Sequence, residues 1–123
     1  MRNILLVEDD KNFAQILKVE LEGETYIVDV AHDGVEAVLN FIHKVYDFVL
    51  LDIKMPRLSG IDALKIIKKL NPHVPAITFS GNAGEAEMAE ALDCGAVECL
   101  AKPFEMGELK THIKNNVSKQ NDP

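Results

Sequence analysis

Five short, strongly apolar runs alternate along this chain with five longer segments whose apolar residues recur every three or four positions. The short runs are rich in Val, Ile and Leu, which favour strands, and the longer segments have the period of amphipathic helices. Because strands that alternate with helices pair in parallel, the pattern predicts an α/β fold: a doubly wound five-stranded parallel sheet with five helices on its two faces. The expected strands are Asn3–Val7, Tyr26–Ala31, Asp47–Asp52, Ala76–Ser80 and Val97–Ala101.

Helix boundaries are indicated by residues that cap or interrupt helices. Asp10 and Asp33 each precede a helical pattern, and their side-chain oxygens can accept hydrogen bonds from the first amides of a helix. Ser59-Gly60 opens the third helical pattern. Asp10 could instead join an acidic group with its neighbours, but a capping role is the favoured interpretation. The expected helices cover residues 11–22, 34–44, 60–71, 83–94 and 105–118.

The apolar positions of each expected helix define the side that faces the sheet. The fourth helix is rich in Ala and Glu and has the weakest apolar stripe, so we expect it to be the least firmly packed. In the third helix, either Ile66 or Ile67 completes the inward face. The other expected inward residues are Phe13, Leu17 and Leu21 in the first helix; Val35, Val38, Leu39 and Ile42 in the second; Ile61 and Leu64 in the third; Met88, Ala91 and Leu92 in the fourth; and Leu109, Ile113 and Val117 in the fifth.

Composition and charge restrict the possible functions. The 123 residues suffice for one domain with its own core, and 47% hydrophobic and 27% charged residues are ordinary for a globular protein. A net charge of −7 argues against direct binding to nucleic acid or anionic lipid, which depends on clustered Lys and Arg. The first apolar run is too short for a signal peptide or a membrane span, so we expect a cytoplasmic protein. Cys94 and Cys99 are expected to be reduced thiols.

Polar residues lie at the same end of four of the five expected strands. Glu8 and Asp9 follow the first, Asp52 ends the third, Ser80 ends the fourth and Lys102 follows the fifth. Each alone has an ordinary explanation as a helix cap or a turn residue. Carboxylates that meet at one edge of a sheet repel one another unless a proton or a cation lies between them, and a hard divalent cation suits oxygen ligands. The coincidence of these residues therefore indicates a site.

These residues, in this order and context, resemble the receiver domain of two-component response regulators. The spacing from Asp52 to Ser80 and on to Lys102 agrees with that family. The resemblance implies a flavodoxin-like strand order of 2-1-3-4-5, with residues 1–118 forming the receiver and residues 119–123 a polar tail. It covers nearly the whole chain and rests on Ile4-Leu5-Leu6-Val7-Glu8-Asp9-Asp10, on Leu51-Asp52-Ile53-Lys54-Met55-Pro56-Arg57-Leu58-Ser59-Gly60, on Ser80 and on Lys102-Pro103-Phe104.

The resemblance implies a phosphoryl acceptor and a metal site. Asp52 matches the aspartate that accepts a phosphoryl group from a phosphohistidine on a sensor histidine kinase or a histidine phosphotransfer protein. Glu8, Asp9, Asp52 and the backbone carbonyl of Lys54 match the residues that hold Mg²⁺, with Asp9 and Asp52 as direct ligands and Glu8 acting through water.

Two further residues are expected to contact the phosphoryl group. Lys102 matches the lysine that pairs with the acceptor at rest and with phosphoryl oxygens afterwards, and the Ser80 hydroxyl matches a donor to one of those oxygens. The family also implies a cis bond between Lys102 and Pro103. Such a domain would assist its own phosphorylation and slow dephosphorylation without being a turnover enzyme. It would act on a downstream protein target or on an effector domain that this sequence lacks.

The chain departs from the family pattern three positions before Lys102, where receivers carry Tyr or Phe and this sequence has Cys99. A thiol cannot replace a ring that swings inward as the Ser80 hydroxyl moves, so the usual aromatic switch is not expected. The loop Gly81-Asn82-Ala83-Gly84 and the lightly packed fourth helix are the alternative carriers of the signal. A separate hypothesis is that the Lys54 ammonium covers the phosphoryl group and slows its hydrolysis.

Three other functions fit parts of the sequence. A receiver-like interaction module that works without phosphorylation would not need the complete acceptor set. A metal-dependent phosphatase with an aspartyl nucleophile would need a second acid two positions after Asp52, where Lys54 stands. A nucleotide-binding protein of the same fold class would need a Gly-rich phosphate loop after the first strand. Each of the three is therefore disfavoured.

Overall fold

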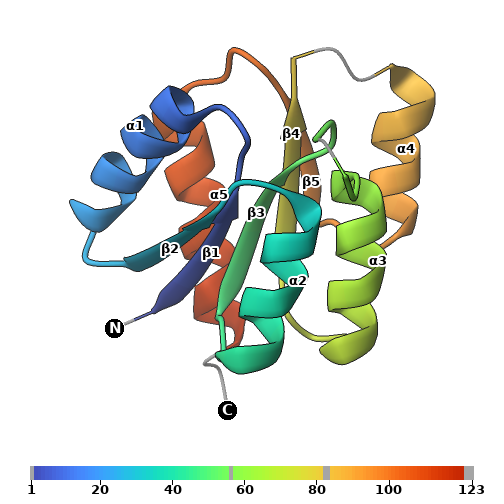
Figure 1. The fold of residues 1–123 in the computed structure, drawn as a ribbon. Helices are drawn as coiled ribbons and strands as arrows, with labels where there is room; N and C mark the ends of the chain where they lie inside the picture. Colours follow the sequence, from blue (N-terminus) through green and yellow to red (C-terminus); the bar gives the residue numbers. More distant parts are fainter. Residues whose placement is uncertain (1, 56, 82–83, 121–123) are drawn as a thin grey trace.

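The computed structural model describes residues 2–55, 57–81 and 84–120. Within them the chain forms a five-stranded parallel sheet, in the order β2-β1-β3-β4-β5, and five helices, so the predicted fold class and strand order are confirmed (Figure 1). The strands are β1 (Asn3–Val7), β2 (Ile27–Ala31), β3 (Phe48–Asp52), β4 (Ala76–Ser80) and β5 (Glu98–Ala101). The helices are α1 (Lys11–Glu22), α2 (Gly34–His43), α3 (Gly60–Leu70), α4 (Glu85–Asp93) and α5 (Met106–Gln120).

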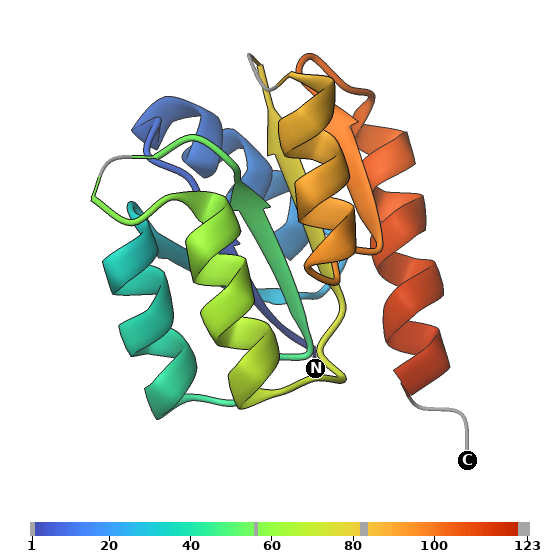
Figure 2. The same ribbon diagram turned by 90° about the vertical axis from the view of Figure 1, so that its right-hand side faces the viewer.

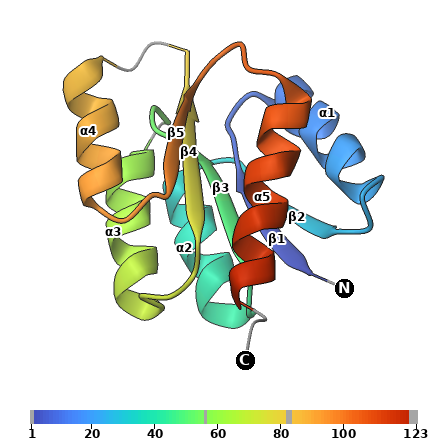
Figure 3. The same cartoon turned by 180° about the vertical axis from the view of Figure 1, so that it is seen from behind.

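The sheet separates two cores. Helices α1 and α5 cover one face, and α2, α3 and α4 cover the other (Figure 1, Figure 2 and Figure 3). Leu50 of β3 and Leu109 of α5 belong to the first core, whereas Leu51 of β3 and Leu64 of α3 belong to the second. Because the central strands contact both cores, their side chains are buried on both faces. This is why they appear in the sequence as continuous apolar runs.

The inward faces predicted for α1, α3 and α5 are confirmed. In α3, Ile67 faces the core, and Ile66 is 37% exposed. Phe13 of α1 is half-buried and packs against the core beneath α1 and α5. The other residues of these helices that are buried as predicted are Leu17, Leu21, Ile61, Leu64, Leu109, Ile113 and Val117.

The inward face predicted for α2 is wrong except at Val38, which packs against the core. The helix presents a different side because Gly34 lies so close to the loop after β3 that a side chain there would overlap the backbone of Leu58. The apolar periodicity of the sequence cannot reveal this close contact between Gly34 and Leu58, because glycine contributes no apolar side chain to the pattern. The residues that face outward instead are Val35, Leu39 and Ile42, and the buried ones are Gly34, Ala37 and Phe41.

Helix α4 is lightly packed, as predicted. Ala91 is its buried residue, Met88 is half-buried, and Leu92 is 46% exposed, which corrects the inward position predicted for Leu92. The helix begins at Glu85 rather than at residue 83. Residues 82–83, in the loop proposed as a carrier of the signal, lie outside the described part of the chain.

The caps predicted for the first two helices are confirmed, and the third helix is also capped. The carboxylate of Asp10 accepts hydrogen bonds from the amides of Asn12 and Phe13 at 3.0 and 3.1 Å, so Asp10 caps α1. Asp33 and Ser59 cap α2 and α3 in the same way. These caps fix the point at which the chain turns from a strand end into a helix.

The chain ends differ slightly from the prediction. Helix α5 continues to Gln120, so residues 119–120 belong to it rather than to a polar tail, and residues 121–123 lie outside the described chain. The peptide bond between Lys102 and Pro103 is cis, as the resemblance implied. Among the described residues, none of the helices has the length and apolar character needed to span a bilayer.

Candidate functional site

The carboxyl ends of β1, β3, β4 and β5 open on one edge of the sheet. Val7 pairs with Leu51 and Ser80 pairs with Ala101, so the residues that end or follow these strands converge. The buried Ser80 ends β4 at this edge. The predicted site residues whose side chains come together here are Glu8, Asp9, Asp52 and Lys102.

Three carboxylates form the centre of this site. Glu8, Asp9 and Asp52 each offer an oxygen, and these oxygens all lie within 4.8 Å of one another. Glu8 and Asp52 are buried, whereas Asp9 is exposed. Each pair of like charges about 4 Å apart costs roughly 4 kcal/mol at an effective dielectric near 20, so the cluster favours a bound cation. Buried and open oxygen ligands together fit Mg²⁺, which keeps several waters beside one or two carboxylates.

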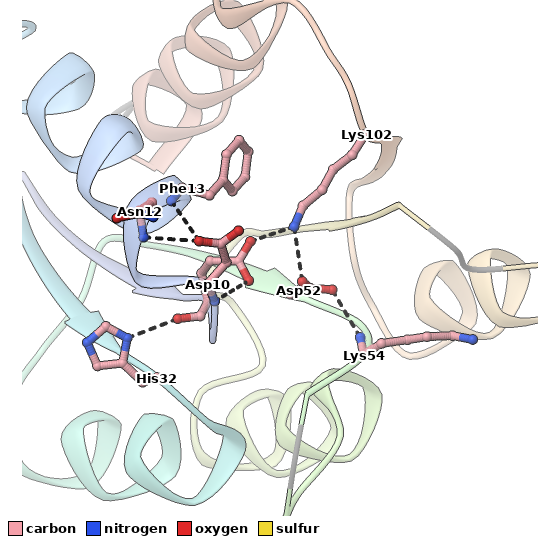
Figure 4. A network of polar contacts seen from close by, with 8 residues as sticks. Asp10, Asn12, Phe13, His32, Asp52, Lys54 and Lys102 are labelled. Carbon is pink, nitrogen blue, oxygen red and sulfur yellow. Dashed lines mark hydrogen bonds and ion pairs between the residues drawn. The ribbon is translucent and has the colours of Figure 1, made fainter.

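Lys102 extends from the loop after β5 into this cluster. Its Nζ donates to Oε1 of Glu8 at 2.5 Å and to Oδ2 of Asp52 at 3.2 Å (Figure 4). Burial alone would lower the pKa of Lys102, but the two carboxylates outweigh burial and raise the pKa above its ordinary value. Lys102 therefore stays protonated and sets one positive charge against the three carboxylates.

The surroundings of the buried Glu8 carboxyl favour its protonated form. Burial raises the pKa of Glu8 to about 7, an effect that Lys102 partly opposes and the charge of Asp52 reinforces. Near neutral pH, a proton on Glu8 and a metal ion at the cluster are therefore alternative ways to relieve the same repulsion.

The stability of the metal-free protein is expected to fall as the pH rises from about 4.5 to about 7. Over this range the folded state keeps the Glu8 proton while the unfolded chain releases it, so rising pH disfavours folding by up to about 3 kcal/mol. Urea unfolding without Mg²⁺, at about pH 5 and about pH 8, measures the loss. Glu8→Gln cannot titrate, and an unchanged pH slope in that variant would contradict the assignment to Glu8.

The backbone after β3 orients the second oxygen of Asp52. Oδ1 accepts a hydrogen bond from the amide of Lys54 at 3.0 Å. The Lys54 side chain extends away from Asp52 (Figure 4). Its ammonium pairs with Glu87 of α4 at 3.3 Å. The resting position of this ammonium is therefore on α4, and the metal-binding role of the Lys54 carbonyl stays a prediction.

The loop that follows Asp52 is braced against α2. Arg57 has a left-handed backbone with φ of 65°, and its guanidinium forms an ion pair with Asp33, the cap of α2. Beside this pair, Gly34 packs closely on the backbone of Leu58. Sequence reasoning missed both contacts, because a single Arg in a loop and a single Gly at the start of a helix carry no sign of their partners.

Aromatic side chains beside Lys102 were also missed as parts of the site. The Lys102 Nζ lies 4.5 Å from the ring centroid of Phe13 and 5.2 Å from that of Phe79. Phe13 was assigned to the core alone, since a ring at helical spacing gives the same pattern with or without a cation above it. On the other side of the site, Nδ1 of His32 lies 3.1 Å from the carbonyl oxygen of Glu8 (Figure 4).

The two cysteines are free thiols, as predicted. Cys99 is buried on β5 and pairs in register with Thr78 of β4. Burial raises the pKa of Cys99, and contact with the Thr78 hydroxyl opposes this only partly. The thiol is therefore protonated at neutral pH and poorly reactive.

Comparison with known proteins identifies the family. The family model described as the response regulator receiver domain matches residues 4–114. Transcriptional regulatory protein CpxR of Escherichia coli (strain K12) is 39% identical over 114 residues, which cover 93% of this chain and 48% of CpxR. The chain spans about half the length of the curated relatives it matches.

Solved structures agree with this family. The receiver domain of Francisella response regulator 1452 is 32% identical with a TM-score of 0.91, over 98% of this chain and 100% of that one. A CheY-like receiver domain protein from Methanospirillum hungatei JF-1 is 29% identical with a TM-score of 0.94, over 98% and 96% of the two chains. With the strand order and the polar strand ends described above, these matches show that the chain belongs to the receiver domain family of two-component response regulators, a family of signalling domains.

Proposed function

We propose that Asp52 accepts a phosphoryl group from a phosphohistidine on a sensor histidine kinase or a histidine phosphotransfer protein. This proposal rests on the surroundings of the Asp52 carboxylate. It is buried at a strand end, with the Lys102 ammonium 3.2 Å from one oxygen and a carboxylate cluster suited to a divalent cation beside it. Positive charge on both sides would neutralise the incoming phosphoryl group.

The transfer conserves atoms and charge in one displacement. An oxygen of Asp52 forms a bond to phosphorus while the bond from phosphorus to the histidine nitrogen breaks, and the imidazole leaves as a neutral base when its other nitrogen carries a proton. The Lys54 amide orients the attacking carboxylate. Lys102 and the Ser80 hydroxyl would then donate to phosphoryl oxygens.

Glu8, Asp9, Asp52 and the backbone carbonyl of Lys54 would hold Mg²⁺ at this site. The bound ion would supply positive charge to the phosphoryl oxygens during transfer. Glu8 is the buried member and accepts the shortest contact from Lys102, so it also keeps that ammonium beside Asp52 when the metal is absent. The chain's own residues thus provide the acceptor, the Lys102 ammonium and the oxygens that would hold the ion.

Labelling with a small phosphoryl donor tests the proposal. Incubation with acetyl phosphate and Mg²⁺ is expected to add one phosphoryl group, seen by intact-protein mass spectrometry and removed by hydroxylamine, which cleaves acyl phosphates. Chelation of Mg²⁺ with EDTA should reduce labelling at least tenfold, because metal-held charge offsets that of the donor. A hydroxylamine-stable product would exclude an acyl phosphate, and no labelling at all would favour the interaction module that works without phosphorylation.

Lys54 is expected to lengthen the lifetime of the phosphorylated protein. Its ammonium lies two residues from Asp52 and rests on Glu87 in an exposed ion pair, which is weak enough to exchange for a phosphoryl group. Lys54→Ala should therefore speed hydrolysis severalfold, measured as the half-life of the phosphorylated protein after the donor is removed. Lys65→Ala is the matched control, since Lys65 is similarly exposed and pairs with Glu90 of the same helix. Equal half-lives in the two variants would contradict this role.

Phosphorylation would act through contacts with other proteins. We propose that residues 1–118 form the receiver unit and that its target is a downstream protein or an effector domain. Slow self-catalysed dephosphorylation would limit how long the signal lasts. The relative CpxR is named a transcriptional regulatory protein, and any such effect of this chain would be indirect because its net charge of −7 opposes DNA binding. Helix α4, with its light packing, is the proposed carrier of the change.

A further inference from the structure

We infer that Phe13 and Phe79 are positioning residues that seat the ammonium of Lys102 at the acceptor site, an inference that rests on the proposed function. The Lys102 Nζ lies 4.5 Å from the centroid of the Phe13 ring and 5.2 Å from that of Phe79. Both distances are within the range in which a cation is attracted by the negative face of an aromatic ring. Figure 4 shows Phe13 on the same side of the site as Lys102.

The two rings are themselves held in place. The Phe13 amide donates to the capping carboxylate of Asp10, which fixes the first turn of α1. The Phe13 ring packs at steep angles on Phe79 and Phe104, with centroids 6.1 and 6.0 Å away, and the Phe79 and Phe104 centroids are 5.8 Å apart. Aromatic pairs of this kind are worth about 0.5–1.5 kcal/mol beyond the area they bury. The two rings are therefore held by their packing on each other and on Phe104.

The carboxylates alone do not give Lys102 a fixed position. Lys102 is a flexible stem with a point charge, and its partners Glu8 and Asp52 change charge when a proton, a metal ion or a phosphoryl group arrives. The rings keep the same shape and the same electrostatic face through all of these events. They would therefore hold the ammonium near Asp52 during the exchange of its ionic partners.

Fluorination of Phe13 tests the seat without changing its shape. Fluorine withdraws electrons from the ring face and weakens its attraction for a cation, while the ring stays in place. Site-specific incorporation of 4-fluoro-, 3,5-difluoro- and pentafluorophenylalanine at position 13 is expected to lower the rate of labelling by acetyl phosphate and Mg²⁺ in steps, to about fivefold overall. The same series at position 104 is the matched control, because Phe104 belongs to the ring cluster without a described contact to the ammonium.

A second pair of variants gives a readout that does not depend on phosphorylation. Phe13→Leu removes the ring and keeps an apolar side chain, and Phe13→Tyr restores a ring. The methylene protons next to the Lys102 ammonium should show an upfield ring-current shift by NMR in the wild type, lose most of it in Phe13→Leu and regain it in Phe13→Tyr. Labelling should follow the same order.

The outcomes separate this inference from the proposed function. Wild-type protein that is never labelled, with the ring-current shift present, would overturn the proposed acceptor and leave the seat intact. Labelling that is equally insensitive to fluorine at positions 13 and 104, or a Lys102 shift that is unchanged in Phe13→Leu, would overturn the seat while the acceptor stands. Equal losses at both positions would show that the cluster acts through packing and would also overturn it.

Discussion

Asp52→Asn is expected to abolish labelling by acetyl phosphate, with a loss of at least a hundredfold. An amide nitrogen and its carbonyl oxygen are poor nucleophiles, so the displacement at phosphorus has no acceptor even though the side-chain shape is preserved. The substitution also removes one of the three clustered carboxylates, which weakens metal binding. The measurement is incorporation per chain by intact-protein mass spectrometry at a fixed donor concentration.

A matched acid on the surface controls for charge. Asp62, in the first turn of α3, is exposed and lies outside the acidic cluster. Asp62→Asn should be labelled like the wild type. Asp52→Asn should remain folded, because it relieves repulsion among buried carboxylates and leaves Lys102 paired with Glu8. Labelling retained in folded Asp52→Asn would refute the assignment of the acceptor.

Gly60→Ala is expected to destabilise the fold by about 3 kcal/mol or more, although it adds one methyl group. A Cβ at position 60 would overlap the carbonyl oxygen of Asp52 and would lie 2.8 Å from Cα of Ile53. Both are backbone atoms, which cannot turn aside as the end of a flexible side chain can. Either α3 must move outward or the end of β3 must shift, and a shift of β3 would also displace the acceptor.

Gly107→Ala is the natural comparison for this variant. Gly107 lies in the first turn of α5, and an added Cβ there would meet no described atom within 4 Å other than its neighbours in the chain and the backbone of its own helix. Alanine there should therefore be neutral or stabilising by about 0.5 kcal/mol. Urea unfolding of both variants measures the difference. A Gly60→Ala protein as stable as Gly107→Ala would show that the contact between Gly60 and β3 tolerates expansion.

The sequence predicted features that depend on chain order and strand direction. Apolar runs located the strands, and parallel pairing follows once helices alternate with them. The residues after each run then have to meet at one edge, which is why Glu8, Asp9, Asp52 and Lys102 could be grouped before their distances were known. Caps such as Asp10 were equally accessible, because a cap contacts amides only two or three residues away.

Features that depend on contacts between distant elements were not accessible in the same way. The outward face of α2 follows from the approach of Gly34 to Leu58, and periodicity contains no information about that approach. The partner of Lys54 is a glutamate on α4, one among several acids that the sequence could offer. Phe13 has the spacing of a core residue and is one, and only the fold reveals the cation beside its ring.

The loop after β3 is held more firmly on the side of α2 than on the side of α4, so the two sides of Asp52 differ in rigidity. Toward α2, the loop meets close backbone packing at Gly34, beside the exposed ion pair between Arg57 and Asp33. Toward α4, the polar links include the exposed ion pair of Lys54 in this loop with Glu87 and that of Lys65 in α3 with Glu90, and such pairs contribute about 0–1 kcal/mol each.

The surroundings of Asp52 are therefore more rigid toward α2 than toward α4. A change at Asp52, whatever its chemical origin, displaces the more weakly held side more than the firmly held one. We therefore expect the deformation that follows phosphorylation to run toward α4, whose buried anchor is Ala91. The direction of this deformation is set by the packing around Asp52, so it does not require an aromatic side chain that changes rotamer at the position of Cys99.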